Sequence, residues 1–143
     1  MATPHVVPVP VRRTWLTALA LAVGAVVTYA VWLGWDQQYQ RDPVTGQTSG
    51  PYESWQVVGC VTTLAVMALL AGAVAHHGLA VVVLPLAFTL AWSIPAARSD
   101  DTGLWGAGAV MILVGTLAGT AVVASTSAAV RQRVCRRPKR AQP

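Results

Sequence analysis

Residues 104–130 read LWGAGAVMILVGTLAGTAVVASTSAAV, and this stretch contains no Asp, Glu, Lys or Arg. A helix that crosses the roughly 30 Å hydrocarbon core of a bilayer needs about 20 apolar residues, because each residue adds 1.5 Å of rise. The stretch is long enough for one crossing. It therefore predicts a transmembrane helix.

Three earlier stretches have the same character, namely residues 14–35, 55–75 and 78–97. Only 10% of the 143 residues are charged, against roughly 25% in soluble domains, and the mean hydropathy is +0.54. Little chain remains outside these spans. We therefore predict an all-α integral membrane protein of the cell (plasma) membrane, with four transmembrane helices in one small bundle over residues 14–130.

The basic residues gather at the two ends of the chain. Eight of the ten Lys and Arg lie before the first span or after the last. These are Arg12, Arg13, Arg131, Arg133, Arg136, Arg137, Lys139 and Arg140. Positive charge next to a span marks the cytoplasmic side, and an even number of spans puts both ends on one side. We predict that both termini are cytoplasmic.

Two terminal segments flank the predicted bundle. Residues 1–13 contain three prolines, which disfavour a helix interior, so we expect a disordered cytoplasmic arm. Residues 131–143 form a basic tail. Short basic runs next to a membrane bind anionic lipid at about 1 kcal/mol per residue, so we expect the tail's Arg and Lys to contact lipid head groups rather than nucleic acid.

The polar loop at residues 36–54 joins the first two spans on the opposite side. Its segment Asp42-Pro43-Val44-Thr45-Gly46 fits a type I turn, which would pair residues 39–41 with residues 47–49. Pro51 fits a first helical position, with Glu53 at the third. We predict a short ordered outer loop. Its expected partner contacts are Tyr39, Asp42, Tyr52 and Glu53.

An alternative for the first span is a cleaved signal peptide. Residues 11–30 have a basic start and an apolar run. The apolar core of a secretory signal is usually about 7 to 15 residues long, whereas this run continues to Trp35. The length favours a retained span, and the alternative stays open.

Small and weakly polar residues predict helix contacts. Gly115 and Gly119 form a G-x-x-x-G pattern, and Gly108 adds a third small site. The contact partner can be this chain's own bundle or another chain. The small hydroxyl groups in the second and third spans are expected to donate hydrogen bonds between helices, namely those of Thr62, Thr63, Thr89 and Ser93.

The sequence lacks the usual signatures of membrane chemistry. None of the four spans contains Asp, Glu, Lys or Arg, the residues on which proton or ion coupling normally depends. His76 and His77 have no third metal ligand near them in sequence, so we expect neither a metal nor a cofactor.

We therefore expect a non-enzymatic accessory or scaffolding subunit of a membrane assembly, whose partners are the lipid bilayer and a protein partner or further copies of the chain. The alternative is a small oligomeric channel, permease or holin-like pore without proton coupling.

Overall fold

The computed structural model describes residues 11–35, 40–41, 48–49, 52–74, 77–100 and 103–136. Within these ranges it contains four long α-helices and two short strands. The helices are α1 (Val11–Trp32), α2 (Ser54–Ala73), α3 (His77–Ser99) and α4 (Trp105–Arg136), and the strands are β1 (Gln40–Arg41) and β2 (Thr48–Ser49).

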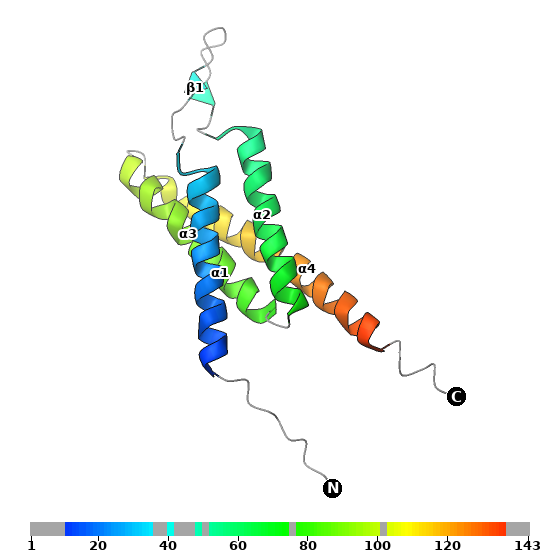
Figure 1. Ribbon diagram of the computed structural model, residues 1–143. Helices are drawn as coiled ribbons and strands as arrows, with labels where there is room; N and C mark the ends of the chain where they lie inside the picture. Colours follow the sequence, from blue (N-terminus) through cyan, green and yellow to red (C-terminus); the bar gives the residue numbers. More distant parts are fainter. Residues whose placement is uncertain are drawn as a thin grey trace, which may run out of the picture.

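All four helices are long and apolar enough to cross a membrane. This confirms the prediction of a helical bundle with four helices of that length and composition. Figure 1 shows that α1 begins and α4 ends at the same end of the bundle, whereas β1 extends from the opposite end. We call these the terminal end and the hairpin end.

Two of the helices extend into segments that we expected to lie outside the bundle. The start of α1 includes residues 11–13, and α4 continues through residues 131–136. The candidate membrane spans within these two helices are Thr14–Trp32 and Trp105–Arg133, and the boundaries of the cytoplasmic arm and tail stay predictions. Arginine is a good helix former and is favourable near a helix C-terminus, so the first charged residue does not end the helix.

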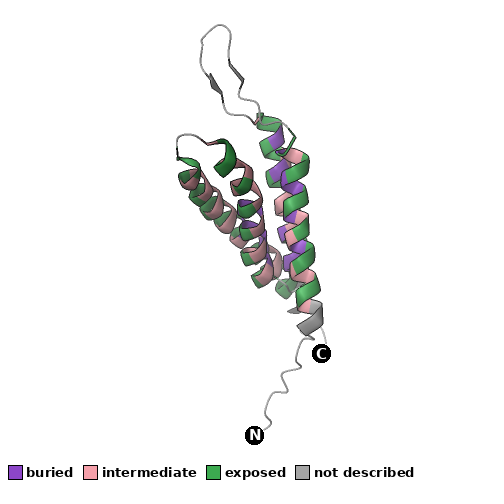
Figure 2. Ribbon diagram, turned by 90° about the vertical axis from the view of Figure 1, so that its left-hand side faces the viewer, coloured by how far each residue is buried: buried purple, intermediate pink, exposed green. Residues whose placement is uncertain are grey.

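The helix order in space follows from which pairs touch. Both α2 and α3 pack against each of the other three helices, whereas α1 and α4 share no packing contact among the described residues. Figure 2 shows the buried residues facing the interior and the exposed ones facing outward. Several fully buried positions are alanines (Ala25, Ala80 and Ala124), which let helix backbones approach closely.

Aromatic side chains fix α1 against its neighbours. The rings of Tyr29 and Phe88 meet edge to face at 6.2 Å and join α1 to α3. Near the hairpin end, Trp55 lies 6.2 Å from Trp32 and 6.3 Å from Trp35 between ring centroids. Indole rings favour the membrane interface, so this cluster fits the ends of two membrane-spanning helices.

The hairpin has the antiparallel register that the turn sequence suggests, with Gln40 opposite Ser49 and Arg41 opposite Thr48. The predicted pairing is confirmed for these four residues.

The start of α2 differs from the prediction. The helix begins at Ser54 and Glu53 is its N-cap, so Glu53 does not occupy a third helical position and Pro51 does not begin the helix. The Glu53 N–H donates a 2.7 Å hydrogen bond to Gln56 Oε1. This is the reciprocal bond of a capping box, a pattern that the residues Glu53 and Gln56 could have signalled.

The link from α3 to α4 is also held by a local bond. The backbone N–H of Trp105 donates a 2.6 Å hydrogen bond to a carboxylate oxygen of Asp100. Between them Gly103 has a φ of 75°, a conformation that glycine adopts without strain. The carboxylate therefore sits at the start of α4, where free amides favour negative charge.

Candidate functional site

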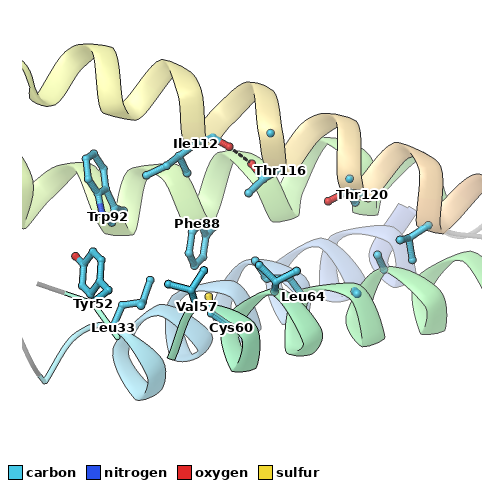
Figure 3. A pocket seen from close by; sticks show the side chains of 16 residues that line it. Leu33, Tyr52, Val57, Cys60, Leu64, Phe88, Trp92, Ile112, Thr116 and Thr120 are labelled. Carbon is cyan, nitrogen blue, oxygen red and sulfur yellow. Dashed lines mark hydrogen bonds between the residues drawn. The ribbon is translucent and has the colours of Figure 1, made fainter. Parts of the chain in front are cut away.

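An apolar pocket of about 400 Å³ lies between α2 and α4. Figure 3 shows these two helices on opposite sides of the pocket. The α2 residues that line it are Val57, Cys60, Val61, Leu64, Ala65 and Ala68. The α4 residues are Ile112, Gly115, Thr116, Gly119, Thr120 and Val123. Phe88 and Trp92 from α3, together with Leu33 and Tyr52, complete the lining.

The two ends of the pocket differ. Leu33 follows α1 and Tyr52 precedes α2, so both mark the hairpin end, and Trp92 of α3 lies at the same level in Figure 3. Toward the terminal end, α2 and α4 come into close contact. There a Cβ on Gly72 would overlap the Ser127 hydroxyl and would lie 2.8 Å from the Ala124 carbonyl oxygen. The pocket thus narrows to a closed helix contact.

The pocket walls offer little polar chemistry. The hydroxyl of Thr116 donates to the carbonyl oxygens of Ile112 at 2.6 Å and Leu113 at 3.2 Å, both in its own helix. Among the described residues, no Asp, Glu, Lys, Arg or His lines the pocket. The arrangement suits an apolar ligand.

The glycines predicted for helix packing fall into two environments. Gly108 faces the ring of Trp92, whose nearest carbon would lie 2.9 Å from an added Cβ. At Gly115 and Gly119 an added Cβ would meet no described atom within 4 Å, and both residues line the pocket. The described part of the chain places no helix against them, and their predicted helix contact stays a prediction.

The outer-loop residues predicted to contact a partner are only partly described. Tyr39 and Asp42 lie outside the described residues, whereas Tyr52 lines the pocket. Glu53 is exposed, and its carboxylate accepts a hydrogen bond from the indole Nε1 of Trp55. The structure therefore gives Tyr52 and Glu53 roles at the start of α2, and their contact with a partner stays a prediction.

The basic residues predicted to contact lipid follow the last apolar turns of α4. Arg131 and Arg133 are exposed on the helix. Arg136 is the last helical residue, and its side chain lies outside the described part. Arg137, Lys139 and Arg140 are outside the described residues altogether. The structure leaves Arg131 and Arg133 accessible to a membrane surface.

The hydroxyl groups do not act as we expected. Thr62 donates to Val58 and Thr63 to Gly59, each within α2. Thr63 does join two helices, but as an acceptor from Trp32 Nε1 at 3.1 Å. Thr89 Oγ1 is buried without a hydrogen-bond partner among the described residues. A helical hydroxyl readily bonds a carbonyl of the preceding turn, which explains why donation between helices is wrong for Thr62 and Thr63.

No group of three or more His, Cys, Asp and Glu that could hold a metal ion occurs among the described residues. His77 is exposed at the start of α3, and His76 lies outside the described part.

The chain matches no known protein family, and no characterised protein or solved structure is detectably similar to it. The fold and the pocket therefore carry the functional argument. Four apolar helices are compatible with a small multi-pass membrane protein.

Proposed function

We propose that this protein is a non-enzymatic integral membrane subunit that acts as an accessory or scaffolding component of a larger membrane assembly. The observation that carries the proposal is the exposure of α4. Among its residues of described burial, only Thr120 and Ala124 are buried, whereas α2 and α3 each bury five residues.

The uncovered side of α4 forms a continuous stripe. We call the residues Met111, Val114, Ala118, Val122 and Ser125 the outer stripe. All five are exposed, and their spacing of three or four positions puts them on one helix face. Met111 is 76% and Val122 is 67% exposed. Small residues in the stripe, here Ala118 and Ser125, permit close approach of a second helix.

The pocket favours an assembly subunit over a pore. A conducting path needs polar or charged groups that replace the water around an ion, and the walls between α2 and α4 are almost wholly apolar. The apolar stretches of the spans also contain no Asp, Glu, Lys or Arg. They therefore lack the side chains that normally bind and release protons in coupled transport. A pore would have to form between copies of the chain.

The proposed orientation places the terminal end in the cytoplasm of the plasma membrane. Arg131 and Arg133 are exposed at this end, where basic side chains are favoured by anionic lipid. The hairpin would then lie outside the cell.

The test is purification of the tagged full chain from its native membrane in a mild detergent. We expect a protein partner at a fixed ratio, and at least a five-fold loss of it in Ala118→Trp. The matched control is Val27→Trp, because Val27 is also an exposed apolar position, 52% exposed, on α1. Equal recovery in both variants would contradict a role of the outer stripe. Ion or solute flux through liposomes containing only this chain would favour the pore.

A further inference from the structure

We propose that the pocket between α2 and α4 binds one acyl chain of a membrane phospholipid, which enters from the hairpin end. This inference goes beyond the proposed assembly role. It concerns the side of α4 that carries Gly115, Thr116, Gly119 and Thr120, and not the outer stripe.

The length of the pocket fits one leaflet. Its α2 wall runs from Val57 to Ala68 and its α4 wall from Ile112 to Val123. Each pair is separated by about eleven positions, which at 1.5 Å of rise gives roughly 16 Å. Half of the hydrocarbon core measures about 15 Å. A chain lying along the helices would therefore reach from the interface to the middle of the bilayer.

The volume of the pocket is sufficient for a hydrocarbon chain. Such a chain, whose width follows from carbon contact distances of about 4 Å, needs on the order of 300 Å³ over this length. The pocket offers about 400 Å³.

The two ends of the pocket suit the two ends of such a chain. Tyr52 and Trp92 lie at the hairpin end, and tyrosine and tryptophan favour the level of the lipid head groups. At the other end, the close contact of Gly72 with Ala124 and Ser127 closes the path. Between the two ends the wall is apolar, and the Thr116 hydroxyl already donates a hydrogen bond within its own helix. A water molecule there would find few hydrogen-bond partners.

Glycine keeps the pocket open on the α4 side. An added Cβ at Gly115 or Gly119 would meet no described atom within 4 Å, so a side chain at either position would begin in free space. Leucine at position 119 should therefore compete with the acyl chain while leaving the helix contacts intact. Leucine also has a better helix propensity than glycine.

The experiment uses the full chain in phosphatidylcholine vesicles that contain a small share of phosphatidylcholine with a photoreactive diazirine on its acyl chain. Because this head group carries no net charge, electrostatic attraction to the basic residues does not contribute to lipid binding. After illumination, labelled residues are mapped by mass spectrometry. We expect a label at Cys60, which is only 3% exposed yet lines the pocket, because a chain outside the pocket cannot reach it.

Gly119→Leu should reduce the Cys60 label at least five-fold. The matched control is Gly106→Leu, since Gly106 is an α4 glycine with no described atom within 4 Å of an added Cβ, and it does not line the pocket. The control should keep the label. Labelling confined to exposed residues outside the pocket, such as Val58 or Val110, or equal Cys60 labelling in both variants, would overturn the proposal. A dimer that Gly119→Leu dissolves, without any Cys60 label, would show a second copy in the pocket instead.

Discussion

The indole Nε1 of Trp32 donates a 3.1 Å hydrogen bond to the hydroxyl oxygen of Thr63, which joins the end of α1 to α2. The same hydroxyl donates to the Gly59 carbonyl oxygen at 2.8 Å. The Trp32 ring lies directly over Gly59, where an added Cβ would overlap it. The absence of a side chain at Gly59 therefore makes the space that this bond needs.

Gly59→Ala should displace the Trp32 ring and break its bond to Thr63. Overpacking of this kind costs about 1 to 3 kcal/mol, which exceeds the helix-propensity gain of about 1 kcal/mol. Gly106→Ala is the control, because no described atom lies within 4 Å of an added Cβ there. Unfolding by sodium dodecyl sulfate in detergent micelles should show a loss of stability for Gly59→Ala only. Equal stability of the two variants would contradict the close packing of Trp32 on Gly59.

Two threonines should respond in opposite directions to substitution by valine. Thr89 Oγ1 is buried without a partner among the described residues, so Thr89→Val removes an unpaired polar group and should stabilise by about 1 kcal/mol. Thr63→Val removes the acceptor of Trp32 and should cost about 0.6 kcal/mol. The same detergent titration compares the two. A loss of stability in Thr89→Val would show that its hydroxyl has a partner, such as a bound water.

The contact at Gly72 should tolerate no side chain. A Cβ there would overlap Ser127 Oγ and lie 2.8 Å from the Ala124 carbonyl oxygen. Gly72→Ala should therefore separate α2 from α4 and cost about 1 to 3 kcal/mol.

A second substitution separates the effect of the Ser127 hydroxyl from that of the Ala124 backbone. Adding Ser127→Ala removes the overlapping oxygen but not the Ala124 backbone, so stability should return only in part. Gly78→Ala is the matched control, because no described atom lies within 4 Å of an added Cβ there. Full recovery in the double variant would mean that the backbone contact at Ala124 is not limiting.

The existence of the four helices follows from composition, because each apolar stretch is long enough to span a bilayer. Their ends do not follow from hydropathy. The apolar count stops at residue 130, whereas α4 continues to Arg136, since arginine and glutamine maintain a helix as well as most apolar residues do. The start of α2 depends on Glu53 and Gln56, whose bond is a local pattern that hydropathy ignores.

The pocket could not be predicted from the sequence, because it depends on where two helices diverge. The G-x-x-x-G pattern marks Gly115 and Gly119 as small. It does not say whether a helix or open space faces them, and here a close α2–α4 contact lies at Gly72 instead. The repeat of Gly-Thr at positions 115–116 and 119–120 is the one signal that these residues share a face.

The last prediction is the orientation of the chain in the membrane. The first residues of α1 and the last of α4 lie at the same end of the bundle, opposite the hairpin (Figure 1). Eight of the ten Lys and Arg belong to the sequence at that end, and insertion favours basic flanks in the cytoplasm. Placing one such residue at a span centre would cost about 2.5 to 3.5 kcal/mol.

Cysteine labelling in intact cells tests this orientation. An impermeant thiol reagent should leave Cys135, in the last turn of α4, unmodified until the cells are lysed. A cysteine introduced by Thr48→Cys in strand β2, in a Cys60→Ala background, should react without lysis because the hairpin would face outward. Modification of Cys135 before lysis, or protection of position 48 until lysis, would reverse the orientation and place the hairpin in the cytoplasm.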